Sequence, residues 1–289
     1  MVPIQRPTPF SILLRVARQF TATIQGRIGF LLIGMNVVIF VVGPYLAPYD
    51  PIETGVGPSA EAPSPSHLLG TDTLGRDILS RFLHGGATIL FVPLAAVTLA
   101  FLIGGALGMA SGYIGGLFGN LVARLLDVTL PIPPLLVALV VIARFGGQLW
   151  VMVAIVAAVY APRIARILRA AVQNLTTMEY VLAAEARGES QTAIIFGEII
   201  PNILAPLLVE YGMRLNFAVS FISSLNFLGL GVQPPSSNWA LMVSESTTLI
   251  PTNPAGALAP MLGLTSLVVG INFLMDSLTQ YLSDETSRV

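Results

Sequence analysis

The sequence contains no cysteine, no lysine and few charged side chains of any kind. Its 289 residues include 14 basic residues, all of them arginine, and 15 acidic ones, so charged residues make up 10% of the chain. The absence of cysteine excludes disulfides, thiolate metal sites and cysteine nucleophiles. The absence of lysine excludes a phosphate-binding loop of the G-x-x-x-x-G-K-[ST] type, so the chain cannot be a P-loop ATPase by itself.

Histidine is also rare in the sequence, and the net charge is close to zero. Only His67 and His84 occur, and two histidines without carboxylate support are expected to belong to a surface loop, so we predict no metal site and no catalytic residue. The net charge of −1 leaves no basic face for nucleic acid, so we predict no nucleic-acid partner.

Apolar residues dominate what is present. They make up 54% of the chain, and the mean hydropathy is +0.81. A soluble domain carries about a quarter charged residues. Too few polar side chains remain to cover a surface in water, so we expect the protein to lie in a lipid bilayer.

Uncharged runs of membrane-spanning length recur along the chain. A span needs about 20 predominantly apolar residues, and the run between Arg81 and Arg124, which holds 42, needs a turn, which residues 111–116 (SGYIGG) offer. The sequence therefore predicts an all-α membrane protein, because helices satisfy their own backbone groups in lipid. The six predicted helices cover 28–46, 88–110, 122–143, 149–168, 202–230 and 257–282.

The arginines set the predicted orientation. With the N-terminus inside, ten arginines fall in cytoplasmic segments (6, 15, 18, 27, 124, 163, 166, 169, 187 and 288) and three outside (76, 81 and 144), which follows the positive-inside rule. Both termini are then cytoplasmic. The predicted organisation is an interfacial helix in 1–27, a six-helix unit over 28–282 and a tail over 283–289, with extracytoplasmic loops at 47–87 and 231–256 and a cytoplasmic loop at 169–201.

Two charged residues lie within the fifth predicted helix. Glu210 and Arg214 are four residues apart with the acid first, which suits an intrahelical ion pair. Ionisable groups at this depth are costly and face a partner or a water-filled path. Either a structural pair or a pair that lines a transport pathway fits the pattern. Asp127 and Asp276 are nearer the inner surface, and we interpret them as interface charges.

Glycines at 104, 108, 112 and 116 recur every four residues, which favours close packing of two helices.

The cytoplasmic loop 169–201 has the pattern of two short capped helices. Thr176 and Glu179 predict a capping box that starts a helix over 177–187, and Gly188 can end it in the left-handed conformation. Ala183 and Ala184 are expected to leave one face flat for another protein. A second helix is predicted over 190–200, up to Pro201. A capped helix displayed beyond the membrane suggests a docking device, and a solvated loop is the alternative.

Three segments resemble a known family. Residues 180–188 (YVLAAEARG) with 200–202 (IPN) resemble the EAA loop of permease subunits of binding-protein-dependent ABC importers. Residues 67–77 (HLLGTDTLGRD), and 226–235 (NFLGLGVQPP) with Trp239, are similar to the dipeptide/oligopeptide/nickel branch, its DppC/OppC-like members. The three motifs occur in the family's order.

The resemblance implies a function and partners. Such permeases form half of a translocation pathway in the inner membrane and work by alternating access. They pair with a homologous second permease subunit, two P-loop ATPase subunits that bind ATP and Mg, and an extracytoplasmic substrate-binding protein. The residues carried over to ATPase coupling are Tyr180, Ala183, Ala184 and Gly188, with Pro201 ending the element. The family's motif often opens with Glu where this chain has Leu182, so Glu179 and Glu185 nearby are the candidate acids.

Other readings stay open at this point. The cargo implied is a dipeptide or oligopeptide, and nickel chelates or another small solute remain alternatives. A self-sufficient secondary transporter is a different class, against which the displayed loop speaks. A membrane-embedded hydrolase is weakest, because no histidine lies in any predicted span.

Overall fold

The computed structural model describes residues 23–286, which are mostly helical. Its elements are α2 (Ile24–Leu46), α3 (Ile78–Gly85), α4 (Ala87–Ile114), α5 (Gly116–Thr129), α6 (Pro134–Phe145), α7 (Leu149–Leu175), α8 (Glu179–Ala186), α9 (Gln191–Ile194), the π-helical turn η1 (Ile195–Ile199), α10 (Ile200–Phe227), α11 (Trp239–Glu245), the 3-10 turn η2 (Thr247–Leu249) and α12 (Ala255–Thr286). Within this described part the only β-type pairing is an isolated bridge between Thr71 and Asp77. The predicted all-α membrane fold is confirmed.

Four helical segments are long and apolar enough to cross a membrane, namely Ile24–Leu46, Ile78–Ile114, Leu149–Leu175 and Ala255–Gln280. Two bent pairs bring the number of spans to as many as six. Gln191–Leu204 and Pro206–Phe227 meet at 66°, and α5 and α6 meet at 82°. The predicted continuous helix over 122–143 is therefore wrong. Prolines at 131, 133 and 134 stand at this bend, and proline removes a helical N–H and clashes with the preceding turn.

The ends of the chain differ from the predicted organisation. Residues 1–22 and 287–289 lie outside the described residues, so most of the predicted interfacial helix, and the end of the tail, lie there too. From Ile24 onward the predicted N-terminal region already belongs to α2, which Thr23 caps by accepting a bond from the Gly26 N–H at 3.0 Å. At the other end α12 continues to Thr286, past the predicted boundary at 282.

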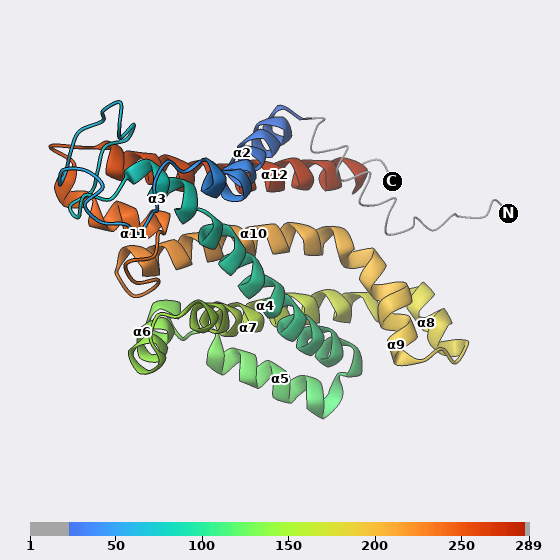
Figure 1. Cartoon of the computed structure of the whole chain (residues 1–289). Helices are drawn as coiled ribbons and strands as arrows, with labels where there is room; N and C mark the ends of the chain where they lie inside the picture. Colours follow the sequence, from blue (N-terminus) through green and yellow to red (C-terminus); the bar gives the residue numbers. More distant parts are fainter. Residues whose placement is uncertain (1–22, 287–289) are drawn as a thin grey trace.

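The molecule has two distinct ends (Figure 1). The loop 47–77, α3 and α11 gather at one end, and α8 and α9 lie at the other. We call residues 47–85 together with α11 the cap. α4 runs between the two ends, and α7 and α10 also extend to the α8–α9 end.

Close packing of α4 on α7 forms the largest contact between helices in the described part. Three of the four glycines that recur every four residues make this packing possible, because a Cβ atom at any of the three would collide with an α7 carbonyl oxygen. The distances would be 2.3 Å from Gly104 to Ala161, 2.6 Å from Gly108 to Ala165 and 2.8 Å from Gly112 to Arg169. Gly116 instead begins α5 with a φ of +57°, where no atom approaches, so it serves the predicted turn.

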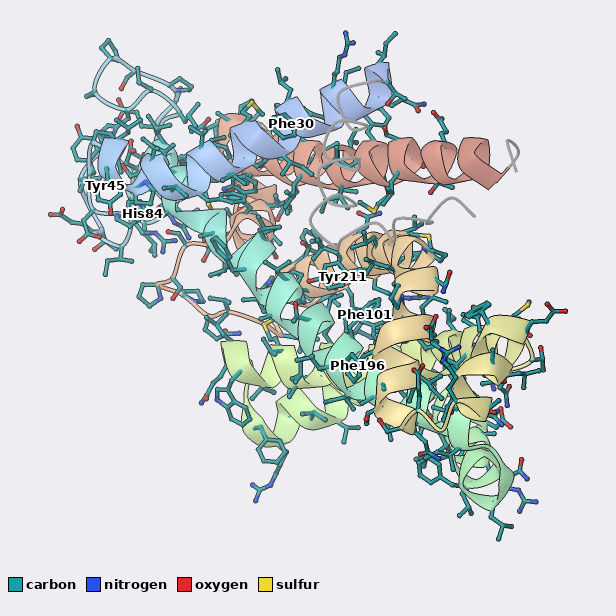
Figure 2. The ribbon with its side chains drawn as sticks, turned by 90° about the vertical axis from the view of Figure 1, so that its right-hand side faces the viewer. Phe30, Tyr45, His84, Phe101, Phe196 and Tyr211 are labelled. Carbon is teal, nitrogen blue, oxygen red and sulfur yellow. The ribbon has the colours of Figure 1, made fainter. Side chains whose placement is uncertain are left out.

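The outward faces of the helices are apolar, as lipid requires. Figure 2 shows Phe30 on the outer side of α2, where its side chain is 62% exposed. Between α4 and α10, Phe101 and Tyr211 lie against each other with ring centroids 5.1 Å apart, and the Tyr211 hydroxyl lies 2.8 Å from Thr98 Oγ1.

Candidate functional site

The segment 176–201 lies at the α8–α9 end of the molecule (Figure 1). The start of α8 differs from the prediction. α7 continues to Leu175 with Thr176 as its C-cap, and the Thr176 hydroxyl donates to the Gln173 carbonyl at 2.9 Å. Met178 takes the N-cap position of α8 and provides no side-chain cap. The predicted capping box between Thr176 and Glu179 is therefore wrong.

The end of α8 agrees with the prediction. Gly188 has a φ of +76°, its N–H donates to the Glu185 carbonyl at 2.9 Å, and the Glu189 N–H donates to the Ala184 carbonyl at 3.2 Å. These two bonds form a Schellman motif, which favours glycine because a side chain is strained at positive φ. Gly188 thus fixes where α8 stops and where the chain turns away.

The two alanines of α8 lie on different faces. Ala184 and Val181 are fully buried in the main hydrophobic cluster, whereas Ala183 is exposed and Leu182 is 50% exposed. The expectation that Ala183 and Ala184 together form a flat outer face is wrong, because residues one apart on a helix point about 100° from each other. Ala184 anchors α8 to the protein, and Ala183 faces outward.

The second half of the segment is continuous with a membrane helix. Ser190 caps α9 by accepting a bond from the Ala193 N–H at 3.3 Å, and the chain then passes through η1 directly into α10. Pro201 lies in the first turn of α10, where a missing N–H is tolerated, so it does not end the element as expected.

The acidic side chains of this segment have specific neighbours. Glu179 and Glu185 are both exposed on α8, and Glu185 Oε1 accepts a 2.9 Å hydrogen bond from the Tyr113 hydroxyl at the end of α4. Burial, and then the negative charge of Glu198, raise the pKa of Tyr180 above its ordinary value, so Tyr180 is a neutral hydroxyl at physiological pH. Sequence reasoning did not find Tyr113, because no local pattern links it to a residue 72 positions away.

The predicted ion pair within α10 is present. Arg214 Nε lies 2.5 Å from Glu210 Oε1, and the two side chains are 18% and 10% exposed. The Arg214 guanidinium also lies 6.0 Å from the centre of the Phe217 ring. Asp127 pairs with Arg166 of α7, and both are more than half exposed. Asp276 is exposed on α12.

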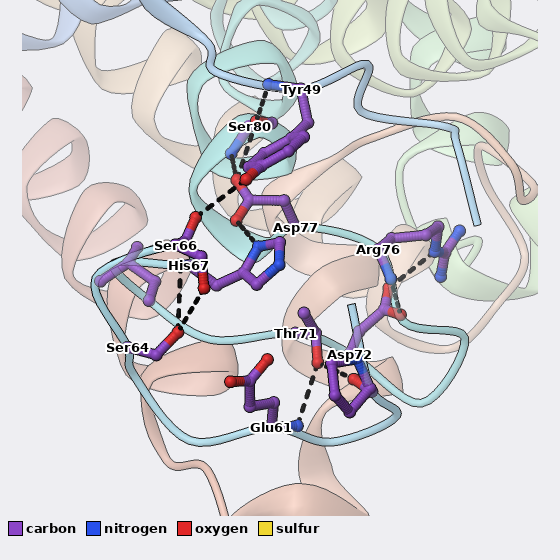
Figure 3. Close-up of polar contacts among 12 residues, drawn as sticks. Tyr49, Glu61, Ser64, Ser66, His67, Thr71, Asp72, Arg76, Asp77 and Ser80 are labelled. Atoms are coloured by element: carbon purple, nitrogen blue, oxygen red, sulfur yellow. Dashed lines mark hydrogen bonds and ion pairs between the residues drawn. The ribbon is translucent and has the colours of Figure 1, made fainter. Parts of the chain in front are cut away.

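A buried cluster of four charged residues holds the cap together, and sequence reasoning missed it. Asp72 Oδ2 lies 2.6 Å from Arg76 Nε and 2.7 Å from Arg81 Nη1, and Glu245 of α11 lies 2.8 Å from Arg81 Nη2. Both arginine side chains are at most 3% exposed. Figure 3 shows the Asp72–Arg76 contact within the folded loop.

His67 is buried in the same loop rather than on a surface, which corrects the expectation. Its Nδ1 lies 3.0 Å from Asp77 Oδ1, and Asp77 Oδ2 accepts bonds from the Ser80 hydroxyl and backbone N–H, both at 2.8 Å (Figure 3). Asp77 thereby caps α3. Across residues 23–286 no three His, Cys, Asp or Glu side chains come together as a metal site.

Comparison with known proteins identifies the chain. The family of binding-protein-dependent transport system inner membrane components matches residues 104–288, a range that includes the α4 glycines, the α8 segment and the α10 ion pair. The chain belongs to this family. It is a multi-pass membrane protein with the predicted resemblance to DppC-like permeases of ABC transporters confirmed.

Relatives match over nearly the whole chain. The dipeptide transport system permease protein DppC of Haemophilus influenzae is 35% identical over 267 residues, which cover 90% of each chain. The di/tripeptide transport system permease protein DppC of Pseudomonas aeruginosa is 35% identical over 88% of this chain and 86% of its own. The glutathione transport system permease protein GsiD of Pectobacterium atrosepticum is 33% identical over 91% and 87%.

A solved structure shares the fold of this permease. The MetNI methionine ABC transporter in an inward-facing conformation matches with a TM-score of 0.55 and 19% identity, over 67% of this chain and 92% of the other.

Proposed function

We propose that this chain is one permease subunit of an ATP-driven importer for peptides, in which it forms half of the translocation pathway. One observation carries the proposal: a short helix, α8, is displayed at one end of an all-helical membrane protein, in a segment that resembles the ATPase-docking loop of such permeases. The similarity of almost the whole chain to dipeptide permeases supports peptides as the cargo. Nickel chelates or another small solute are the alternative cargo of the same architecture.

The proposed complex holds a homologous second permease subunit, two P-loop ATPase subunits and an extracytoplasmic substrate-binding protein. ATP and Mg bind in the ATPase subunits, and this chain carries out no bond chemistry. α8 would sit in a groove of one ATPase with Leu182 and Ala183 toward it, while Ala184 and Val181 hold α8 on the permease. Closure of the ATPase dimer would then move α8 and open the pathway toward the binding protein.

The proposed function also implies an orientation of the protein in the membrane. The α8–α9 end is cytoplasmic and the cap faces the binding protein, with both termini inside. Glu210 and Arg214 have two candidate roles, a structural pair or a pair on the pathway, and the partial exposure of Arg214, at 18%, favours contact with the pathway.

Purification and reconstitution test the function. A mild detergent extract of the native membrane should yield this chain with a second permease and P-loop ATPases. Vesicles holding that complex and its binding protein should take up labelled dipeptides only with ATP, and a longer peptide and a nickel chelate compare the cargo classes. Deletion of 179–187 should abolish ATPase binding and uptake. Uptake by this chain alone, or by the deletion variant, would establish a secondary transporter instead.

A further inference from the structure

A single polar contact ties α8 to a membrane helix that is not its neighbour in sequence. α8 follows α7 through residues 176–178 and leads to α10 through α9 and η1. The hydrogen bond from the Tyr113 hydroxyl to Glu185 Oε1, 2.9 Å long, adds a link to α4. Bonds to a carboxylate are shorter and stronger than bonds between neutral groups.

Packing aims the Tyr113 hydroxyl at α8. Tyr113 is half-buried against the main hydrophobic cluster, which also contains Val181 and Ala184 on the inner face of α8. Glu185 follows directly on Ala184, so the buried alanine places the carboxylate near the tyrosine. The Tyr113 ring and the inner face of α8 therefore pack on the same hydrophobic cluster. The hydrogen bond from the Tyr113 hydroxyl sets their relative position.

α4 connects α8 to the cap as part of a continuous helical rod that has Pro93 in its interior (Figure 1). With α3 it forms one helical segment, Ile78–Ile114, of 37 residues, which is about 55 Å at 1.5 Å per residue. Gly86, between α3 and α4, has helical angles of φ −83° and ψ −33°, so the rod has no sharp bend there. The close contacts of Gly104, Gly108 and Gly112 with α7 lie in the half of the rod that is nearer to α8.

The far end of this rod is fixed in the cap. Arg81 of α3 is 1% exposed and pairs with Asp72 of the loop and Glu245 of α11. Trp239 of α11 is fully buried, stacks on Phe82 at 4.9 Å and donates its indole N–H to the Phe82 carbonyl at 2.7 Å. These contacts join α3 to both the loop and α11.

We propose that the Tyr113–Glu185 contact couples α8 to the α3–α4 rod, so that an ATP-driven movement of α8 reaches the cap at the opposite end of the molecule. Tyr113 and Glu185 are positioning residues in this scheme. The inference rests on the proposed function, because it requires an ATPase that moves α8. It assigns to Tyr113 a role in transmission that α7 and α10 do not replace.

The chain's lack of cysteine provides the test. A single Leu74→Cys substitution, at a cap residue that is 54% exposed, accepts a membrane-impermeant fluorescent maleimide at one position of this chain. The labelled chain is purified as the full complex with its ATPases, reconstituted in vesicles, and its ATP-dependent fluorescence change is recorded beside its ATPase rate. This readout requires no knowledge of the cargo.

Variants separate coupling from stability. Tyr113→Phe removes one hydroxyl and keeps the packed ring, Glu185→Ala removes the acceptor, and Glu185→Gln keeps an acceptor oxygen. Thr98→Val is the matched control, because it removes a hydroxyl contact between α4 and Tyr211 of α10, far from α8. We expect Tyr113→Phe to retain assembly and ATPase activity but to lose most of the fluorescence change. Glu185→Ala should lose as much of the fluorescence change, and its ATPase binding is measured separately because Glu185 is also a candidate acid for ATPase contact. Glu185→Gln should keep most of the fluorescence change, and Thr98→Val all of it.

The double variant Tyr113→Phe/Glu185→Ala should lose no more than either single one, since both remove the same bond. A Tyr113→Phe complex with a wild-type fluorescence change, or additive losses in the double variant, would overturn the inference. So would a wild-type complex that hydrolyses ATP without any change at Leu74. If no ATPase accompanies the wild-type chain, the proposed function itself fails, and the two failures are therefore distinct.

Discussion

At the scale of single residues, Glu210 and Arg214 show how the surroundings set the consequence of a substitution. The Glu210 side chain is 10% exposed within α10 and depends on Arg214 for its charge partner. Removing one member of a buried pair leaves an uncompensated charge, which costs more than removing both.

We therefore expect Arg214→Ala to lower the free energy of unfolding by about 3 kcal/mol, and Glu210→Ala with Arg214→Ala together to lower it less. Thermal unfolding of the detergent-solubilised complex measures this order. The double variant also separates the two candidate roles. Normal transport at normal assembly identifies a structural pair, and a large transport loss with normal assembly and ATPase activity identifies a pathway pair.

Gly104 provides a second prediction at this scale. A Cβ atom there would lie 2.3 Å from the Ala161 carbonyl oxygen, so Gly104→Ala must push α4 away from α7. Overpacking of this kind costs about 1–3 kcal/mol. Gly34→Ala in α2 is the matched control, because nothing lies within 4 Å of its added carbon. A melting temperature that falls for Gly104→Ala and not for Gly34→Ala would agree with the packing, and equal values would contradict it.

At the scale of elements, the sequence predicts what lipid and local backbone chemistry dictate. The first, second, fourth, fifth and sixth predicted spans match α2, α4, α7, α10 and α12 in position, because an uncharged run of this length has few alternatives to a membrane helix. The prolines of the TLPIPP sequence also indicated the break at 130–133. It was not predicted, because the uncharged run around it was interpreted as one continuous span.

The short helices were harder to predict. α3 was missed because Arg81 and His84 interrupt its apolar pattern, although Asp77 before it is a typical N-cap residue. In α8 the glycine end was predictable from one residue, but the inner and outer faces were not. Which alanine is buried depends on where α4 and α7 end, and this is set by tertiary packing.

The end of α8 carries the prediction at this scale. Gly188 has a φ of +76°, so Gly188→Val should strain the turn by about 1–2 kcal/mol and misplace α8 without unfolding the membrane helices. We expect less ATPase to co-purify with this variant at an unchanged yield of permease. Gly197→Ala in η1 is the control, since it has open space and no positive φ. Equal recovery of ATPase with both variants would show that the glycine end of α8 has no part in docking.

At the scale of the whole molecule, the contacts that unite the two ends are invisible in a single sequence. Arg81 and Glu245 are 164 residues apart, and no sequence pattern around either residue indicates that the two form a pair. The cap cluster was therefore not predicted, although the two segments that carry it, 47–87 and 231–256, were predicted as loops on the same side of the membrane.

This cluster makes the last prediction. Arg81→Met keeps a long side chain but leaves Asp72 and Glu245 with Arg76 as the remaining cation of the cluster, inside a site where the arginines are almost wholly buried. Removing one member of a buried charge cluster costs about 3–5 kcal/mol, and this loss weakens the attachment of α11 to α3, which then depends on Arg76, on Trp239 and on the apolar contacts of Met242. Hydrogen exchange in 231–256 should therefore accelerate in Arg81→Met while α7 stays protected. The exposed Arg144→Met, which removes an arginine from the same end of the molecule, should leave exchange unchanged. If hydrogen exchange is the same in Arg81→Met and Arg144→Met, the contacts of Trp239 with Phe82 hold the cap to α3, and the charged cluster does not.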